Sequence, residues 1–490
     1  MDSSNSMIMN PPHEREIFAN RTLNLKAIQA IGYDMDYTLI NYDVMRWELA
    51  MYEYLKRRML ELGWPVQDLE HDPEMTIRGL VVDTKLGNFV KPNRFGYIKR
   101  ACHGTTPIDI KALRRVYSRV TVDIRDDRWL LLTTLFDLPL ACIYAQLVDK
   151  LDGSGLPQVS SYADLMEQML SNLDAAYAEG MMRNEILKDP DGYVVEDAEI
   201  PLTLLDQKHA GKKLILITDS EWEYVGKIMP YAFDPHLPAG MIWRDLFDLV
   251  IVSAGKPNFF LQKQPAFELA TEEGLLRRVV GPLKMGSIYV GGHAGLVEEA
   301  FGLQGGDIMY VGDHLESDVH ATKSILRWRT GLVLRELEIE FQSLQEFHEQ
   351  QVELSKMMAQ KTALERQQVQ LRLQLQRQKL GYGLDSGESV EKLRQRHEAI
   401  TEDIARLDTH IAPFAQKAGM LFNPRWGLLT RAGNDKSYLT RILEGYADIY
   451  MTRVSNFLYR TPFAYLRSTR SSLPHDGGII GGPHETESAD

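Results

Sequence analysis

Two aspartates, Asp34 and Asp36, follow the apolar run in the segment AIGYDMDYTL. Two carboxylates that face the same cavity repel each other, so they need a shared cation or proton. Mg²⁺ prefers oxygen ligands and keeps waters and substrate phosphate oxygens in its shell, and a carboxylate can also attack phosphorus as a nucleophile. The pair therefore predicts Mg²⁺-assisted phosphoryl chemistry; the alternative is a loop with two solvated acids.

Polar residues with complementary chemistry follow other apolar runs. The hydroxyl of Thr218 in ITDS, with the amides of its loop, suits a phosphate oxygen. Lys256 in AGKP supplies a compact cation for charge that develops on a transferred group. Asp313 and Asp318 in GDHLESD can complete a Mg²⁺ site. Alone, the threonine is explained as a helix cap and the lysine as a surface residue, but their order after predicted strands favours a phosphoryl-transfer site.

Several short apolar runs are the predicted strands that position these residues. They are apolar on both alternating faces, as in strands that are covered on both sides. Helix-like stretches separate them, and this alternation predicts an α/β fold with a doubly wound parallel sheet. The site of such a sheet lies at the carboxyl ends of its strands, where the polar residues follow. The predicted strands are residues 27–34, 212–220, 246–257, 306–314 and 329–334.

The spacing of these strands predicts a large insertion. Residues 35–211 separate the first strand from the second, which is far more than one crossover connection requires. We therefore expect a large α+β cap after the first strand. The predicted parts are a catalytic core of residues 1–42 and 206–335 and a cap of residues 43–205.

The region after the core is rich in Gln, Glu and Leu and predicts a long helical hairpin over residues 336–418. Apolar residues from Leu393 to Phe414 recur at alternating spacings of four and three, which is the heptad pattern of a coiled-coil seam. Packing within one chain and contact with another copy both fit this seam. An aromatic helical segment over 419–475 is expected to pack on the core, and the tail 476–490 is expected to be disordered.

Composition excludes several classes of protein. The net charge of −13 argues against general nucleic-acid binding, which usually requires a basic surface. Cys102 and Cys142 are the only cysteines, so no disulfide framework is expected and a reducing compartment is predicted. The polar start lacks the profile of a signal peptide, and no apolar run approaches the length of a membrane span. We expect a soluble, cytoplasmic protein without a membrane partner.

Taken together, DMDYTL, Thr218, Lys256 and GDHLESD resemble the four motifs of the haloacid dehalogenase (HAD) phosphohydrolase superfamily. The chain further resembles the cytosolic purine 5′-nucleotidase branch from about residue 15 to residue 475. That branch has counterparts of RGLVVDTKLGNFVK (78–91), KIMPYAFD (227–234), RDLFDLVIVSAGKPNFF (244–260), YVGDHLESDV (310–319) and GYADIYMTRVSNFLYRTPFAYL (445–466).

The resemblance implies a HAD-like Rossmannoid core and a role for each motif residue. Asp34 would be the nucleophile that forms an aspartyl-phosphate, and Asp36 the general acid and then the base. Thr218 and Lys256 would hold and neutralise the phosphoryl group, because positioning and electrostatics dominate phosphoryl transfer. The implied cofactor is Mg²⁺, and its implied ligands are the Asp34 carboxylate, the Asp36 backbone carbonyl and Asp313, with Asp318 in support.

The resemblance also implies that residues of the cap read the base. Asp174 matches an acidic residue that can accept a hydrogen bond from a purine ring NH, although it could equally be an exposed helical acid. Arg183 stands where the branch has a lysine, and Tyr177 offers a ring on which a base can stack. These three residues are candidate substrate contacts.

Other cap positions depart from the branch. Leu170 stands in place of an arginine, and Thr105 and Thr106 stand in place of a Phe-Asn pair that contacts the base. Loss of a hydrogen-bonding partner can change discrimination between substrates by orders of magnitude. Thr106 and His103 are retained as candidate substrate contacts, with a packed core histidine as the alternative for His103.

The sequence therefore predicts an Mg²⁺-dependent 5′-nucleotidase for purine nucleoside 5′-monophosphates such as IMP or GMP. The branch can also pass the phosphate to another nucleoside, and it tends to form homo-oligomers. Two alternatives stay open: a HAD phosphatase for another phosphate monoester, which the altered cap favours, and a non-catalytic scaffold that uses the hairpin for partners. The complete set of motif residues argues against the scaffold.

Overall fold

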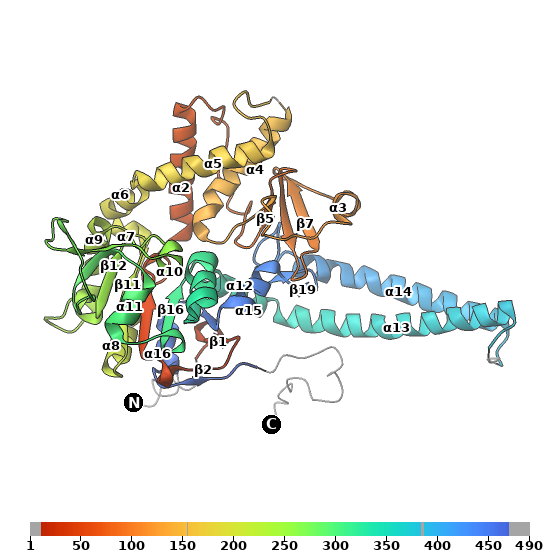
Figure 1. Cartoon of the computed structure of the whole chain (residues 1–490). Coiled ribbons are helices and arrows are strands. Elements are labelled where there is room, and N and C mark those ends of the chain that lie inside the picture. The colour runs from red at the N-terminus through yellow and green to blue at the C-terminus, as the bar shows by residue number, and fades with distance from the viewer. Residues whose placement is uncertain (1–10, 154, 384–386, 470–490) are drawn as a thin grey trace. The chain divides into compact units, whose positions relative to one another are not determined.

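The computed structural model describes residues 11–153, 155–383 and 387–469, so the predicted tail 476–490 lies outside the described residues. The chain divides into two compact units, which are described separately below (Figure 1). Among the described helices, none is both long enough and apolar enough to cross a membrane. Unit 1 contains Met1–Met51, Asp174–Arg335 and Arg441–Asp490, and unit 2 contains Tyr52–Leu173 and Glu336–Thr440.

The first unit contains a ten-stranded sheet in the order β1-β20-β17-β16-β3-β11-β12-β15-β13-β14. All neighbouring pairs from β20 to β15 are parallel, whereas β1, β13 and β14 are joined antiparallel at the edges. The predicted α/β class with a large parallel sheet is confirmed at this level. The strands are β1 (Phe18–Ala19), β3 (Ala30–Tyr33), β11 (Lys213–Ile217), β12 (Leu249–Val252), β13 (Ala266–Leu269), β14 (Leu276–Arg278), β15 (Ile288–Gly291), β16 (Ile308–Gly312), β17 (Arg329–Val333) and β20 (Ile449–Met451).

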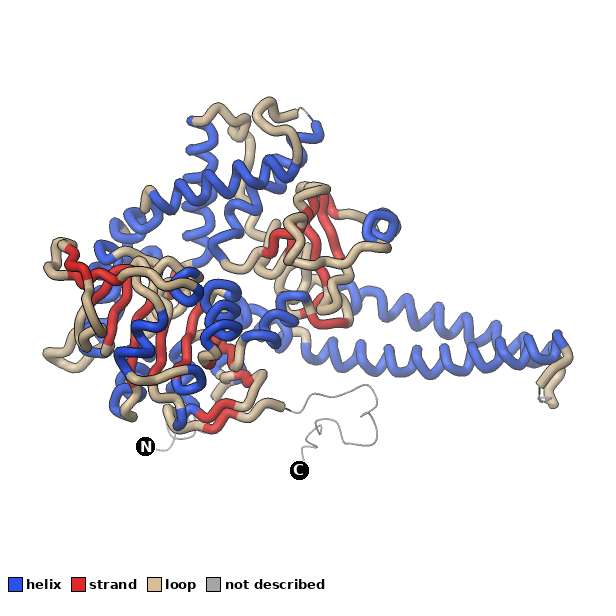
Figure 2. Tube along the Cα trace, in the orientation of Figure 1, coloured by secondary structure: helices blue, strands red, loops and turns tan. Residues whose placement is uncertain are grey.

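The central strands are buried along their whole length. Every residue of β3, β12 and β16 is buried, which explains their continuous apolar sequences. Ile215, Tyr310 and Trp328 belong to one core cluster of this unit. Helices are packed around the strands (Figure 2), among them α8 (Glu199–His209), α9 (Trp222–Phe233) and α11 (Ala294–Phe301).

One part of the C-terminal segment differs from the helical prediction. Its aromatic residues at near-helical spacing indicated a helix, but among its described residues the α-helical parts are α15 (Tyr438–Tyr446) and α16 (Phe457–Arg460), with a 3-10 turn at Val454–Asn456. Between them, β20 pairs in parallel with β17, with Tyr450 opposite Leu332. A strand of three residues is too short to show an alternating pattern, and its β-propensity was hidden among the aromatic residues.

The second unit contains a five-stranded antiparallel sheet in the order β8-β7-β6-β5-β9. The buried helix α4 (Leu138–Gly153) follows it, with Ala141, Tyr144 and Val148 fully covered. The strands are β5 (Val81–Asp83), β6 (Asn88–Pro92), β7 (Ile98–His103), β8 (Thr106–Pro107) and β9 (Trp129–Leu131), and α3 (Ile110–Tyr117) lies between β8 and β9 in the sequence.

Two long helices of this unit, α13 (His348–Leu380) and α14 (Val390–Ala418), pack along each other (Figure 1). Leu354, Met357 and Ile411 form a small buried cluster between them, against which Leu407 and Phe414 pack. The heptad residues of α14 therefore face α13 within one chain. A contact with a second copy stays a prediction.

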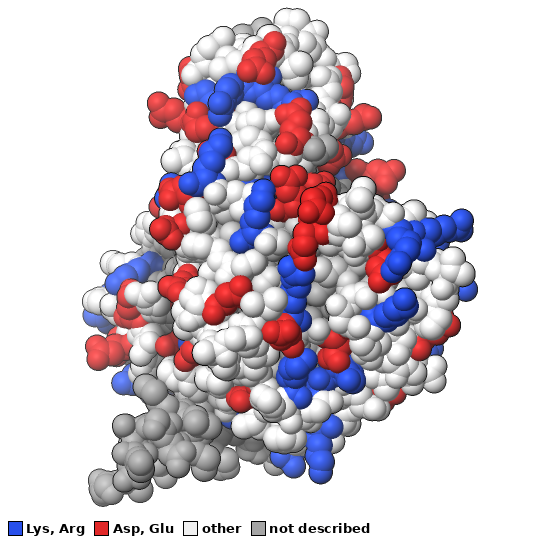
Figure 3. All heavy atoms as spheres, turned by 90° about the vertical axis from the view of Figure 1, so that its left-hand side faces the viewer, with Lys and Arg blue, Asp and Glu red and all other residues white. Residues whose placement is uncertain are grey.

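Charged side chains of both signs are interspersed on the face drawn in Figure 3. No single sign covers this face in a continuous stripe. Surfaces of this kind keep a protein dispersed without creating a strong field for steering a charged partner.

Candidate active site

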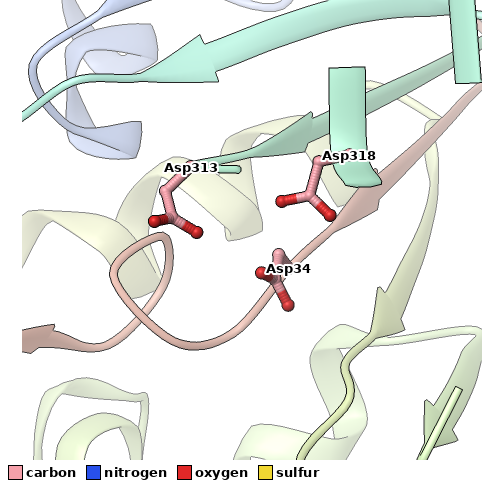
Figure 4. A group of neighbouring side chains, drawn as sticks. All are labelled: Asp34, Asp313 and Asp318. Atoms are coloured by element: carbon pink, nitrogen blue, oxygen red, sulfur yellow. The ribbon is translucent and has the colours of Figure 1, made fainter. Parts of the chain in front are cut away.

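Three buried carboxylates converge at the carboxyl ends of two neighbouring strands (Figure 4). Asp34 follows β3, and Asp313 follows β16, which is its parallel neighbour. Asp318 lies in the π-helical turn Leu315–His320 directly after them. One oxygen of each carboxylate can be chosen so that all three lie within 4.8 Å of one another. The parallel sheet brings these acids together because the ends of its strands meet at one edge.

A glycine makes room for this arrangement. A Cβ atom on Gly312 would lie 2.2 Å from Oδ2 of Asp318 and 2.6 Å from its Cγ atom. Any larger residue at this position would displace the Asp318 carboxylate. Oδ2 of Asp318 also accepts a hydrogen bond of 3.1 Å from the backbone N–H of His314, which fixes the turn.

Lys256 reaches into the acidic cluster from the loop after β12. Its Nζ atom lies 2.9 Å from Oδ1 of Asp34 and 2.8 Å from Oδ1 of Asp318, and it donates to the Tyr310 hydroxyl at 3.2 Å. The three N–H bonds of the ammonium group thus have three partners. Lys256 thus brings one positive charge to two of the three clustered carboxylates.

Electrostatics change the protonation of this cluster. Burial raises the pKa of Asp34 well above its usual value; Lys256 opposes the rise, and the charges of Asp318, Asp313 and Asp36 add to it. Burial by itself lowers the pKa of Lys256, but Asp318 and Asp34 outweigh it and raise that pKa well above its usual value. A buried site with this charge balance favours an additional cation or proton.

The donor set fits a hard divalent cation. Asp34, Asp313 and Asp318 are 7%, 2% and 0% exposed, and each offers a carboxylate oxygen toward the same space. Carboxylate oxygens are the ligands that Mg²⁺ and Ca²⁺ prefer. The observed convergence therefore supports a metal site, and it does not by itself distinguish between these two ions.

The side chain of Asp36 has different partners from Asp34. The Tyr42 hydroxyl donates to its Oδ1 at 2.5 Å, and the Ser220 hydroxyl donates to its Oδ2 at 2.6 Å. The Tyr42 hydroxyl is also 2.8 Å from the hydroxyl of Tyr224. Burial, with a contribution from Asp36, raises the pKa of both phenols, so they stay neutral. The two aspartates of DMDYTL therefore lie in separate hydrogen-bonding environments.

The loop after β11 carries Thr218, Asp219 and Ser220. Thr218 is fully buried, and its hydroxyl accepts a 3.1 Å hydrogen bond from the Ser220 N–H. Oδ1 of Asp219 accepts from the Lys256 N–H at 2.8 Å, and burial raises the pKa of Asp219. The loop thus contacts two other parts of the site: Asp219 accepts from the Lys256 backbone, and Ser220 donates to the Asp36 carboxylate.

Three of the candidate substrate contacts belong to the same unit as this site. Tyr177 lies on α5 (Tyr162–Ala178). The pKa of Tyr37 is raised mainly by burial, next by the charge of Glu48, and then by Tyr177, which therefore lies near Tyr37. Arg183 lies on α6 (Met181–Lys188), with its Nη1 atom 3.6 Å from Oε1 of Glu221. Asp174 is exposed on α5.

The other two candidates, His103 and Thr106, belong to the second unit. The ring of His103 already has two partners there: Nδ1 lies 2.6 Å from Oδ1 of Asn88, and Nε2 lies 2.6 Å from Oδ2 of Asp152. Thr106 is exposed on β8. A substrate role for either residue stays a prediction.

Several residues of the site were not singled out from the sequence: Tyr42, Ser220, Tyr224, Asp219 and Tyr310. Ser220 and Asp219 stand in the ITDS motif beside Thr218, so the motif itself contained their signal. The tyrosines have no local signal, because Tyr42 and Tyr224 are far apart in the sequence.

Comparisons with known proteins identify the family of the chain. The profile of the 5′ nucleotidase family matches residues 17–478. A 5′-nucleotidase domain-containing protein of Dictyostelium discoideum is 26% identical over 477 residues, which cover 94% of this chain and 75% of that protein. A solved archaeal β-phosphoglucomutase from Pyrococcus sp. strain ST04 is 13% identical, and the match covers 62% of this chain and 86% of that protein. Its TM-score of 0.30 is too low to bear on the fold.

The family profile covers nearly the whole length of the chain, including both sequence stretches that supply the carboxylate cluster. The chain therefore belongs to the 5′ nucleotidase family and is a hydrolase of the 5′-nucleotidase type.

Proposed function

We propose that the chain is an Mg²⁺-dependent 5′-nucleotidase that hydrolyses purine nucleoside 5′-monophosphates, such as IMP and GMP, through an aspartyl-phosphate on Asp34. The observation that carries the proposal is the convergence of Asp34, Asp313 and Asp318 on one space, with Lys256 in contact with two of them. The order of the motifs along a parallel sheet supports a HAD-like core. The 5′ nucleotidase family generally uses a divalent metal.

The metal would be held by the carboxylates of Asp34 and Asp313 and by the backbone carbonyl of Asp36, with Asp318 in support. When bound, Mg²⁺ would neutralise charge on the phosphoryl group and so favour attack by an anionic nucleophile. Lys256 would exchange part of its contact with Asp34 for a phosphoryl oxygen. The Thr218 loop would hold another phosphoryl oxygen.

The reaction proceeds in two displacement steps. An oxygen of Asp34 attacks phosphorus, the bond from phosphorus to O5′ breaks, and the proton of Asp36 passes to O5′ of the leaving nucleoside. Asp36 then takes a proton from water as that water attacks the phosphoaspartate, which releases inorganic phosphate and restores Asp34. A nucleoside hydroxyl in place of water would give phosphate transfer to that nucleoside.

The choice of base is assigned to the predicted cap, residues 43–205. Arg183, Tyr177 and Asp174 are the proposed contacts in the unit that carries the cluster, and Arg183 pairs with Glu221, the residue that follows Ser220. His103 and Thr106 are retained as predicted substrate contacts. We further propose that the protein is cytoplasmic and homo-oligomeric, with the hairpin 336–418 available for contacts between copies.

A phosphate-release screen tests the proposal. Purine and pyrimidine nucleoside monophosphates and sugar phosphates are compared with and without Mg²⁺, and we expect the fastest release from IMP or GMP with Mg²⁺. Turnover of sugar phosphates alone would replace the nucleotidase with the second candidate, a phosphatase for another monoester, which the Leu170, Thr105 and Thr106 positions favour. No turnover of any substrate would contradict both.

A further inference from the structure

The carboxylate of Asp36 is held at both oxygens by hydroxyl groups of the protein. Tyr42 donates to Oδ1 at 2.5 Å and Ser220 donates to Oδ2 at 2.6 Å. These partners come from separate elements: Tyr42 from β4 (Asn41–Tyr42), which pairs with β10 (Val194–Val195), and Ser220 from the loop after β11. A side chain held by two elements keeps a single orientation, which is what a proton donor requires.

A second tyrosine, Tyr224, joins the hydrogen bonds around Asp36. The hydroxyl of Tyr224, in the first turn of α9, lies 2.8 Å from that of Tyr42. A phenol has one proton to donate. An ionised Asp36 carboxylate only accepts, so in that state the proton of Tyr42 goes to Oδ1 and Tyr42 accepts from Tyr224. The chain of donors therefore runs from Tyr224 to Tyr42 to Oδ1 of Asp36.

Both partners of Asp36 can also accept a hydrogen bond. The Tyr42 hydroxyl can pass its own proton to Tyr224, and the Ser220 hydroxyl can either donate or accept. The same contacts therefore hold the Asp36 carboxyl group in one orientation whether it is ionised or protonated, which suits a group that gives up a proton and takes one back.

We propose that Tyr42 and Tyr224 are positioning residues that hold the carboxyl group of Asp36 in the orientation from which it passes its proton to the leaving oxygen. The inference rests on the proposed function, because it takes Asp36 as the general acid. It adds two residues to that assignment. The rings stay necessary for packing, since Tyr42 is 2% and Tyr224 3% exposed, but the inferred role belongs to the hydroxyl groups.

The competing explanation is that the two hydroxyls only stabilise the fold. Leaving groups of different acidity distinguish the two explanations. An alkoxide such as O5′ of a nucleoside needs protonation as it leaves, whereas 4-nitrophenolate leaves without it. Loss of an oriented acid therefore slows nucleotide hydrolysis selectively, whereas a structural defect slows both substrates alike.

The experiment measures kcat and KM of Asp36→Asn, Tyr42→Phe and Tyr224→Phe with IMP and with 4-nitrophenyl phosphate. The matched control is Tyr289→Phe, which removes another buried hydroxyl in this unit, one that bonds to the backbone of Lys284. Since general acid–base catalysis contributes about 10²–10⁴-fold, we expect Asp36→Asn to lose at least about 100-fold with IMP and far less with 4-nitrophenyl phosphate. Circular dichroism and thermal melting establish that each variant is folded.

For Tyr42→Phe we expect kcat with IMP to fall about tenfold or more, with KM unchanged and less than about threefold loss with 4-nitrophenyl phosphate. Tyr224→Phe, which does not touch Asp36, should show the same selectivity with a smaller loss, and it serves as the test if Tyr42→Phe does not fold. Suppose that Asp36→Asn slows IMP hydrolysis selectively. Equal losses on both substrates for the two tyrosine variants, or no loss, would then overturn the inference but leave the proposed function intact. An unselective Asp36→Asn would instead overturn the acid role in the proposed function and the inference with it.

Discussion

Buried carboxylates occur in both units, but their charge is balanced in different ways. In unit 1, Asp34, Asp313 and Asp318 lie together, and Lys256 contacts two of them, Asp34 and Asp318. In unit 2, Asp83 is fully buried and has its own arginine: Arg128 donates Nε to Oδ1 at 2.8 Å and Nη2 to Oδ2 at 2.6 Å. Tyr117 adds a hydrogen bond of 2.9 Å to Asp83.

The difference shows how to distinguish a functional from a structural acid. A bidentate pair such as that of Asp83 and Arg128 is neutral as a unit and needs nothing further. A cluster with an excess of buried charge is costly unless a ligand completes it. Burial of an acid therefore carries little information about function, and the count of opposite charges around it carries much more.

The largest expected effect comes from Asp34→Asn. The amide cannot attack phosphorus, so kcat should fall by about 10⁴-fold or more. The fold should persist, because the change removes one of three mutually repelling charges. The matched control, Asp83→Asn, should retain kcat in the protein that stays folded. Substantial turnover by Asp34→Asn, measured by phosphate release, would show that the nucleophile lies elsewhere.

The second prediction concerns stability in unit 2. Arg128→Met leaves Asp83 buried without its charge partner, and this should lower the free energy of unfolding by about 3–5 kcal/mol. Because the pair is structural, kcat of the folded fraction should not change. Urea unfolding of Arg128→Met, Asp83→Asn and the double variant measures the coupling between the two residues. If the double variant is no more stable than Arg128→Met, the unpaired charge of Asp83 is not the cause of the lower free energy of unfolding.

Divalent cations should distinguish the carboxylate cluster of unit 1 from the Asp83–Arg128 pair of unit 2. Mg²⁺ at 100 times its dissociation constant should stabilise the wild-type protein by about 2.7 kcal/mol, since it binds the folded state. Asp313→Asn should reduce this stabilisation, whereas Asp83→Asn should leave it unchanged. Thermal melts over a range of Mg²⁺ concentrations provide the measurement. An Asp313→Asn variant that responds like the wild type would place the ion outside the cluster.

The smallest effect concerns Lys91, a buried cation of unit 2 that donates to the backbone carbonyls of Trp426 and Leu428. Burial lowers the pKa of Lys91 from 10.5 to about 7. A neutral amine keeps two N–H bonds, which suffice for the two carbonyls. The unfolded chain therefore binds more protons than the folded one between these values, and stability should rise with pH from about 7 to about 10.

Each pH unit in this interval should add at most about 1.4 kcal/mol. The test compares the free energy of unfolding of the wild type and of Lys91→Met from pH 6 to pH 10. Methionine lacks the titration, so the difference between the two proteins should grow with pH and become constant below pH 7. A difference independent of pH would contradict the depressed pKa.

Sequence patterns predicted one part of this picture better than another. The proximity of Asp34 and Asp313 follows from buried strands that run parallel, because the positions after such strands meet at one edge. The bonds from Tyr42 and Tyr224 to Asp36 depend on where a short strand and a helix end, and no periodicity records that. β20 was hidden for a similar reason, as its pairing with β17 is a tertiary contact.

The central claim is that phosphate passes through a covalent bond to Asp34. The most direct measurement is to quench turnover of a nucleotide with labelled phosphate in acid and to map the labelled peptide by mass spectrometry. We predict a base-labile label on Asp34 that forms only with a divalent cation and is absent from Asp34→Asn. A label on another residue, or efficient turnover without any phosphoenzyme, would contradict the account.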